Sequence, residues 1–221
     1  MGRYEQIQAV NPQLTIYDSR SEVFKRYGNF IGNDTKEICE IAIQNLVIPE
    51  KGSCYIPAME ALDQSSWAEE LRKKNCGCLD EQIGVCYGHS DQMNALEWHT
   101  CAEFNVAVTY MILILAKRED IEGNNRINAD KVKFFYIHQG DLIEVYSDTL
   151  HFCPCEVSKE GFISIVGLQR GTNLPLQDES MRGLLRAQNK WLIAHEGNEA
   201  MIETGAVAGI YGENWKIKSI D

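Results

Sequence analysis

The sequence predicts a mainly β protein in which short antiparallel strands form a sandwich or a barrel. Residues 106–116 are almost all apolar or β-branched, which is typical of a strand buried in a core, and the run is too short to span a membrane. From residue 81 to residue 167, short strand patterns follow one another through turns and polar loops, with no helical pattern between them. Strands joined in this way pair antiparallel, which argues against a parallel α/β sheet.

The first 80 residues are predicted to combine an extended piece at residues 13–17 with three short helices. Each helix follows a side chain that can accept a hydrogen bond from the first helical turn. The helices cover residues 22–27 after Ser21, a segment after Asp34 or Thr35 that ends before Pro49, and residues 67–74 after Ser65 or Ser66. These elements are expected to be structural, and Gly28 is expected to end the first of them.

Residues 81–175 are predicted to form the core of the barrel. Alternating or continuously apolar segments separated by turn residues define the expected strands. They cover residues 81–87, 94–105, 106–116, 132–137, 142–146, 149–157 and 161–167, and residues 117–131 form a polar surface loop.

Residues 176–221 are predicted to add a C-terminal helix and a closing strand. Leu184, Leu185 and Trp191 have helical spacing within residues 180–195, and a Gly-punctuated strand follows at residues 205–212. Lys190 and His195 lie where they could reach the mouth of the barrel and bind a phosphate or carboxylate. A solvated lysine and a helix-capping histidine are the simpler account, so neither is predicted to be catalytic.

The composition narrows the class of partner. The formal net charge is −11, from 21 basic against 32 acidic side chains. Nucleic acids and anionic membranes both need a basic face, so neither is the expected partner. The N-terminal residues contain no continuous apolar segment of the kind found in export signals, so a soluble, cytoplasmic protein is expected.

The eight cysteines are predicted to be free thiols, because disulfides are rare in the cytoplasm. Cys39, Cys54 and Cys86 are expected to be small buried residues. A second hypothesis joins Cys76 and Cys78 with Cys153 and Cys155 as four thiolate ligands of zinc, although zinc sites more often use cysteines separated by two residues. His89 is expected to lie at the surface.

The candidate site lies in residues 94–105. In an extended strand, Glu97, His99, Cys101 and Glu103 project to one face, because successive side chains point to opposite faces. A solvated polar face of an edge strand would explain this pattern equally well. The most apolar segment of the chain follows directly, however, which favours an interior position. There the polar row would need a partner such as a metal ion.

Two segments resemble the two motifs of the cupin superfamily. In cupins the first motif runs from Gly through His-x-His to Glu, and this chain has Glu97-x-His99 followed by Glu103 after Gly88. The second motif begins with Gly-Asp and ends with His. Gly140-Asp141 and His151 match it here, while Tyr146 and Asp148 replace its Pro and Gly. The two motifs cover about a third of the chain.

The resemblance implies a fold, a ligand set and an oligomeric state. The expected fold is a cupin-like double-stranded β-helix, or jelly-roll barrel, with N-terminal and C-terminal helices, in which residues 1–221 form a single domain. The expected metal ligands are Glu97, His99, Glu103 and His151, with Glu in place of the usual first His. Cupins often pair through sheet edges, so a homodimer is expected.

Two narrower resemblances point to different activities. Residues 94–108, taken with residues 149–155, are similar to an uncharacterised bacterial cupin-like family that is associated with carbohydrate utilisation. Residues 24–28 resemble the opening of the ureidoglycolate lyase cupins.

The ligand set itself suggests a chemistry. Two imidazoles and two carboxylates suit Mn, Fe, Zn, Ni or Co rather than calcium, and leave positions that a small polar substrate could chelate. The first hypothesis is aldose-ketose isomerisation of a sugar or sugar acid, with Glu97 or Glu103 as the catalytic base. The alternatives are a ureidoglycolate-type lyase, a dioxygenase, which oxidation-prone Cys101 and Cys153 disfavour, and a non-catalytic sugar-binding module.

Overall fold

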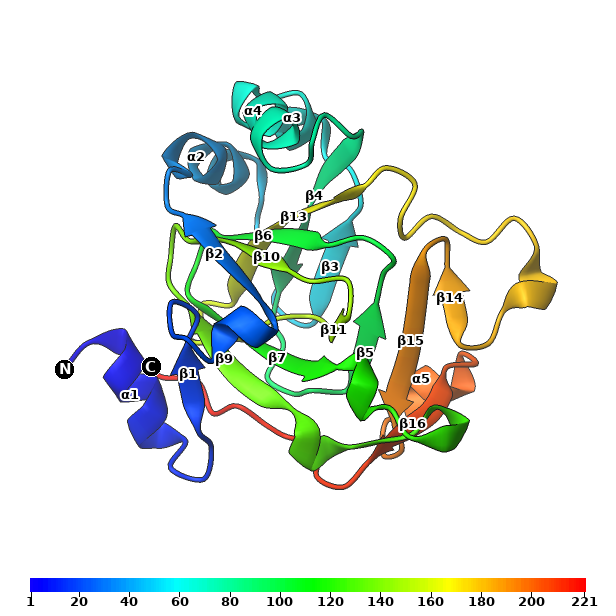
Figure 1. Ribbon diagram of the computed structural model, residues 1–221. Coiled ribbons are helices and arrows are strands. Elements are labelled where there is room, and N and C mark those ends of the chain that lie inside the picture. The colour runs from blue at the N-terminus through cyan, green and yellow to red at the C-terminus, as the bar shows by residue number, and fades with distance from the viewer.

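The computed structural model describes residues 1–221, apart from the side chain of Glu179, and strands dominate it (Figure 1). The mainly β prediction is therefore confirmed. The strands form three sheets, two of which pack face to face as in a jelly roll. Among the described residues, no helix is long and apolar enough to cross a lipid bilayer.

The first sheet is antiparallel throughout and supplies one wall of the barrel. Its six strands lie in the order β2, β10, β6, β13, β4, β3. Their bounds are Gly28–Gly32 (β2), Leu142–Val145 (β10), Glu103–Ala107 (β6), Phe162–Gln169 (β13), Glu81–Gly88 (β4) and Ser53–Ile56 (β3).

The second sheet forms the facing wall. Its central strand β7 pairs antiparallel with β9, β11 and β12, while β1 joins β9 in parallel. The bounds are Ile16–Asp18 (β1), Lys133–Ile137 (β9), Met111–Lys117 (β7), Thr149–Leu150 (β11) and Cys155–Glu156 (β12).

The third sheet closes one end of the barrel and includes the strand that carries Glu97. Strand β15 is its centre and pairs with β14, β16 and β5, and β8 pairs with β16. The bounds are Leu185–Ala187 (β14), Lys190–His195 (β15), Val207–Tyr211 (β16), Ala95–Trp98 (β5) and Ile127–Asn128 (β8).

Short α-helices lie on the outside of the barrel. They are Arg3–Val10 (α1), Lys36–Asn45 (α2), Glu60–Asp63 (α3), Ser66–Lys74 (α4) and Glu199–Glu203 (α5). Figure 1 shows α2, α3 and α4 together above the first sheet. The predicted start of α4 is confirmed, because Ser65 Oγ accepts a hydrogen bond from the backbone N–H of Ala68. Helix α2 begins after Thr35 and ends before Pro49, also as predicted.

Burial explains why β7 is continuously apolar. All seven of its residues are buried, and its two faces belong to different core clusters. Met111, Leu113 and Leu115 pack between the two large sheets, while Ile112 and Ile114 face the second cluster beneath α1 and the third sheet. A strand covered on both faces cannot alternate apolar with polar residues.

The predicted helix at residues 180–195 is wrong. This segment forms the β14–β15 hairpin, which turns at Gln188 and Asn189, and Asn189 has a left-handed φ of 55°. Trp191 and Ile193 pack on one core cluster while Leu192 and Ala194 pack on another, so both faces of the strand are buried. The apparent helical spacing came from apolar residues on both arms of a hairpin.

The N-terminal prediction also needs correction. Helix α1 occupies residues for which no helix was expected. Of the turn predicted at residues 22–27, Phe24–Arg26 form a 3₁₀ helix with Tyr27 as its C-cap, and Gly28 follows directly as the first residue of β2. A Cβ at Gly28 would lie 2.1 Å from the carbonyl oxygen of Glu144, so close approach of two strands explains this glycine.

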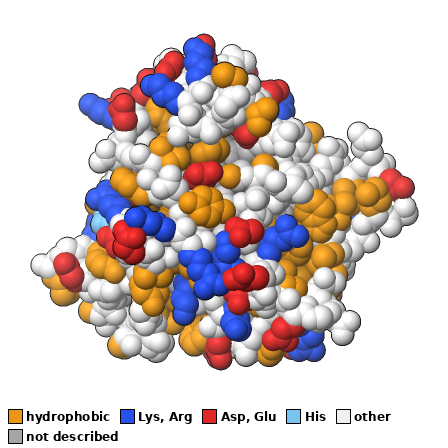
Figure 2. Space-filling view, in the orientation of Figure 1, with side chains coloured by type: hydrophobic (Ala, Val, Ile, Leu, Met, Phe, Trp, Pro, Cys, Tyr) orange, Lys and Arg blue, Asp and Glu red, His pale blue; other side chains and the backbone are white. Residues whose placement is uncertain are grey.

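The charged surface shows no segregation on the face drawn in Figure 2. Acidic and basic side chains lie side by side there, although acidic residues are in excess over the whole chain.

Candidate metal centre

The predicted single strand at residues 94–105 is wrong, and its interruption builds the site. Strand β5 ends at Trp98, residues 99–102 bend, and β6 begins at Glu103. The predicted strand at residues 106–116 is likewise divided between β6 and β7. Glu103 therefore approaches His99 across a bend rather than along the face of one strand.

The alternation of β6 sends its polar side chains inward. Phe104 and Val106 pack in the cluster beneath α2, α3 and α4. Successive side chains point to opposite faces of the sheet, so Glu103 and Asn105 face the interior of the barrel. There Asn105 Nδ2 donates to Glu103 Oε1 at 3.0 Å, and Asn105 Oδ1 accepts from Ser164 Oγ.

Backbone pairing places His151 beside Glu97. The N–H of Glu97 donates to the carbonyl of His151 at 2.6 Å, and the N–H of His151 donates to the carbonyl of Glu97 at 3.0 Å. This reciprocal bridge lies just beyond β11, so residues 54 positions apart are fixed as neighbours by main-chain hydrogen bonds. The expectation that the fold returns His151 to this segment holds in the structure.

The four predicted side chains converge. One potential ligand atom from each of Glu97, His99 and His151 lies within 4.8 Å of the other two. Glu103 Oε2 is 3.5 Å from His99 Nε2 and 3.2 Å from His151 Nε2, and Glu97 Oε1 is 3.9 Å from His99 Nε2. All four residues are buried, and the His99 side chain has no exposed surface.

A hydrogen bond from Nδ1 to a backbone carbonyl orients each imidazole ring. His99 Nδ1 donates to the carbonyl of Asn189 at 2.7 Å, and His151 Nδ1 donates to the carbonyl of Thr149 at 3.2 Å. In the neutral rings the lone pair then belongs to Nε2, the atom that faces the cluster. Histidine ligands of metal ions are usually held in this way.

Unpaired buried atoms test whether a metal ion fits. Within the described residues, His99 Nε2 is buried without a hydrogen-bond partner, and Glu97 Oε2 has only the ammonium group of Lys190 as its partner. An unsatisfied buried polar atom costs about 1–3 kcal/mol, which a coordinated cation would relieve. Two imidazole nitrogens beside two carboxylates form a mixed N/O set that suits a divalent transition metal, so the residues fit the group.

Charges within the cluster shift two pKa values. Burial alone would raise the pKa of Glu103, but His151 and His99 together hold it well below its usual range. Burial alone would lower the pKa of His151, but Glu103, and then Glu97, raise it to about 9. In the metal-free protein the two groups form a buried ion pair, and metal binding at His151 must release a proton.

Asn189 was missed from the sequence as a site residue, and Lys190 was expected only to be able to reach the mouth of the barrel; both lie at the β14–β15 turn. Asn189 Oδ1 accepts from Thr100 N at 2.9 Å and from Thr100 Oγ1 at 2.6 Å, while its carbonyl holds His99. Lys190 Nζ forms an ion pair with Glu97 Oε2. The signal available in the sequence was Gln188-Asn189, a two-residue polar turn between two apolar arms.

The cluster opens into a cavity of about 190 Å³. Its lining combines Glu97, Glu103 and His151 with other polar and apolar side chains, including Tyr55, Asn105, Phe152, Asn173 and Lys190. Asn173 Nδ2 donates to Tyr55 Oη at 3.0 Å. Burial, followed by the charge of Glu103, raises the pKa of Tyr55 well above its usual value, so Tyr55 remains a neutral phenol.

The cysteines do not form a zinc site. All eight are free thiols. Cys76 lies in the cluster beneath the helices, whereas Cys155 lies in the cluster against α1, so the four-thiolate hypothesis is wrong. Cys54 is exposed, and Cys39 and Cys86 are half-buried rather than fully buried as expected.

The other singled-out side chains have local partners. Cys101 Sγ accepts from Asn189 Nδ2 at 3.4 Å. His89 is partly buried, and its Nδ1 lies 2.6 Å from Glu156 Oε2. His195 is a buried strand residue rather than a helix cap, and its Nε2 donates to the carbonyl of Gly212 at 3.1 Å.

The fold and this cluster define a mainly β protein with a candidate metal centre inside its barrel. The profile of a protein family described as a domain of unknown function (DUF4867) matches residues 16–215, and the chain belongs to that family. No curated protein matches the chain.

Solved structures with detectable likeness are distant. A structure of Bacillus subtilis oxalate decarboxylase, from a study of its Mn(II) centres, is 11% identical over 44% of this chain and 24% of that chain, with a TM-score of 0.31. A point mutant of the same enzyme is 10% identical over 57% and 28%, with a TM-score of 0.33. Procruciferin, an 11S globulin from Brassica napus, is 11% identical over 51% and 23%, with a TM-score of 0.27. This chain matches about a quarter of the length of those chains, and likeness at this level says nothing about activity.

Proposed function

We propose that the protein is a divalent-metal-dependent, cupin-type enzyme that interconverts aldose and ketose forms of a small sugar or sugar acid. The observation that carries the proposal is the buried Nε2 of His99, which makes no hydrogen bond within the described residues and lies 3.5 Å from Glu103 Oε2. It faces two carboxylates and a second imidazole, and both rings are fixed through Nδ1. The cupin-like spacing of Glu97, His99, Glu103 and His151 supports it, as does the similarity to a cupin-like family associated with carbohydrate utilisation.

Glu97, His99 and His151 would hold the ion. These are the three residues whose ligand atoms lie within 4.8 Å of one another. When bound, the ion supplies Lewis-acid polarisation of a substrate carbonyl.

Glu103 is the proton-transfer base in this proposal. In the metal-free protein its Oε2 accepts a hydrogen bond from His151 Nε2 at 3.2 Å and lies 3.5 Å from His99 Nε2. Once His151 Nε2 serves as a ligand it cannot donate to Glu103, while Asn105 still holds Oε1. The freed Oε2 can take the proton from the hydroxyl-bearing carbon next to the carbonyl and return it to the carbonyl carbon, while the proton of that hydroxyl moves to the former carbonyl oxygen.

Other lining residues would bind and enclose the substrate. Tyr55 Oη already accepts from Asn173, so its own proton can be donated to a substrate hydroxyl. Phe152 and Val166 give the cavity apolar surface that limits the access of water to the reacting carbons.

Metal content and isomerisation test the proposal together. Protein purified without chelator should contain a divalent transition metal by elemental analysis and should interconvert at least one aldose-ketose pair in a panel of sugars and sugar acids followed by NMR. Glu103→Gln should keep the metal and lower turnover by about 10² to 10⁴-fold, whereas Glu97→Gln should lose metal affinity. A protein that binds no divalent metal, or wild-type turnover in Glu103→Gln, would overturn these assignments.

A further inference from the structure

Lys190 places a positive charge inside the candidate metal centre. Its Nζ contacts Glu97 Oε2, and its side chain is only 21% exposed. Among the described residues that line the cavity, it is the sole lysine or arginine. A lysine that merely contributes solubility would lie in water, so this position needs a physical account.

The backbone fixes where Lys190 lies. It is the first residue of β15, next to Asn189, whose carbonyl holds His99. The following residue, Trp191, pairs with Trp98 of β5, and their indole rings stack with centroids 6.4 Å apart. The stem of Lys190 therefore starts from a rigid hairpin beside the metal centre.

Lys190 and Glu97 form a direct ion pair between Nζ and Oε2. Lys190 Nζ also lies 5.9 Å from the centroid of the Phe152 ring, which lines the same cavity. Such an arrangement leaves the ammonium group able to exchange one anionic partner for another.

The net charge of the metal-loaded cavity indicates which kind of ligand Lys190 would bind. Glu97 and Glu103 supply two negative charges, and Lys190 supplies one positive charge. A divalent cation bound among them leaves one positive charge in excess, beside the buried side chains of Glu97, Glu103 and His151. A buried excess charge is costly, so the metal-loaded cavity favours a ligand that carries one negative charge.

We propose that Lys190 is an anion-binding residue that leaves Glu97 when Glu97 coordinates the ion and then binds a carboxylate of the substrate. The ligand class is a small hydroxy-carbonyl compound bearing one carboxylate, such as a sugar acid, rather than a neutral sugar. This inference rests on the proposed metal site and narrows its substrate class. The cavity of about 190 Å³ matches a ligand of this size, since a water molecule occupies roughly 30 Å³.

Two small probes isolate the effect of the carboxylate. Hydroxypyruvate and dihydroxyacetone share a hydroxy-carbonyl unit and differ in carrying a carboxylate or a hydroxymethyl group. Isothermal titration of the Mn²⁺-loaded protein with each probe gives the preference for the anion. Lys190→Met should reduce that preference roughly tenfold or more, while Lys190→Arg should retain most of it.

Metal affinity gives a readout that does not depend on the probes. Lys190 competes with the ion for Glu97, so Lys190→Met should bind Mn²⁺ roughly three- to tenfold more tightly than the wild type. Lys36→Met is the matched control, because it removes an exposed lysine of helix α2 and should change neither quantity. Lys190→Gln provides a second neutral variant if Lys190→Met folds poorly.

The outcomes separate this inference from the proposed function. A wild-type protein that binds no Mn²⁺ would overturn the proposed function and the substrate class with it. Mn²⁺ binding with the same anion preference in wild type, Lys190→Met and Lys190→Gln would overturn the role of Lys190 alone. Weaker Mn²⁺ binding in both neutral variants would also contradict it, because it would make Lys190 a structural support of the metal centre.

Discussion

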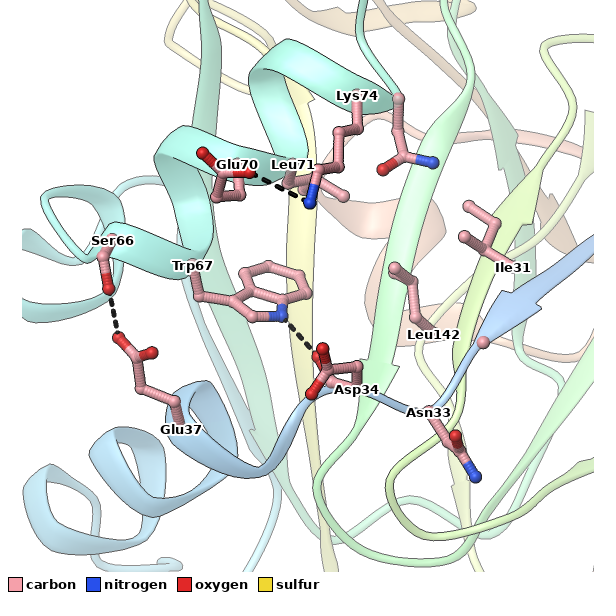
Figure 3. A pocket seen from close by; sticks show the side chains of 12 residues that line it. Ile31, Asn33, Asp34, Glu37, Ser66, Trp67, Glu70, Leu71, Lys74 and Leu142 are labelled. Carbon is pink, nitrogen blue, oxygen red and sulfur yellow. Dashed lines mark hydrogen bonds and ion pairs between the residues drawn. The ribbon is translucent and has the colours of Figure 1, made fainter.

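Two cavities of this protein differ in size and in the state of their polar atoms. The larger, about 490 Å³, lies between helices α2 and α4 and strands β2 and β10 (Figure 3). Its polar groups bind one another. Trp67 Nε1 donates to the carbonyl of Asp34 at 2.9 Å, Ser66 Oγ donates to Glu37 at 2.7 Å, and Lys74 pairs with Glu70 at 3.0 Å.

The smaller cavity, of about 190 Å³, has the opposite character. Beside it, His99 Nε2 is buried without a hydrogen-bond partner among the described residues, and within its lining Lys190 forms an ion pair with the buried Glu97. Judged by volume alone, the groove between the helices would be the favoured binding site. An unpaired buried polar atom, which is costly unless a ligand meets it, indicates the metal centre instead.

The largest expected effect comes from removing an imidazole. His99→Asn should reduce affinity for Mn²⁺ or Zn²⁺ by roughly 100-fold or more, because a primary ligand contributes more than the 10- to 100-fold of an outer-shell partner. Competition against a chromogenic chelator measures this change. His138→Asn is the matched control, since His138 is half-exposed and lies against Asp18 rather than in the cluster. Equal losses of metal affinity in both variants would show that the loss does not come from the candidate metal centre.

A smaller effect is expected at the turn that holds His99. Asn189 adopts a left-handed φ of 55°, which alanine disfavours by roughly 1–2 kcal/mol and glycine accepts. Asn189→Ala should displace the carbonyl that fixes His99 and lower metal affinity about 10- to 100-fold. Asn189→Gly should retain more of the affinity, because it keeps the turn and its carbonyl. If glycine and alanine behave alike, the side-chain bonds to Thr100 matter more than the backbone conformation.

The smallest effect is expected in the groove between the helices. Trp67→Phe removes the hydrogen bond to the Asp34 carbonyl at a partly exposed position and should lower the free energy of unfolding by about 0.5–1.5 kcal/mol. Metal affinity should not change. Chemical denaturation and metal titration of the same preparation check both statements. A loss of metal binding would show that the helical layer supports the metal centre.

From the sequence we could choose the four side chains that the structure brings together, but we could not predict the path of the chain around them. Glu97, His99, Glu103 and His151 could be chosen because histidines and carboxylates recur at motif spacing beside the most apolar segment. The bend at residues 99–102 could not be predicted, since the uninterrupted parity of residues 97–103 favours a single strand.

The hairpin of β14 and β15 was missed for a related reason. Buried on both faces, β15 lacks the alternation that identifies a strand, and apolar residues on the two arms imitate helical spacing. With a helix assigned there, Lys190 could be placed only near the mouth of the barrel, and Asn189 could not be placed behind His99. Both roles depend on tertiary pairing between Trp98 and Trp191, which no local pattern encodes.

A crystal structure of the protein with Mn²⁺, recorded at wavelengths on both sides of the manganese absorption edge, tests the central claim most directly. The account predicts one anomalous peak within about 2.0–2.3 Å of His99 Nε2 and His151 Nε2, with Glu97 as a ligand and Lys190 Nζ moved away from Glu97. An empty cluster at saturating Mn²⁺, or an ion bound only at surface carboxylates, would contradict it.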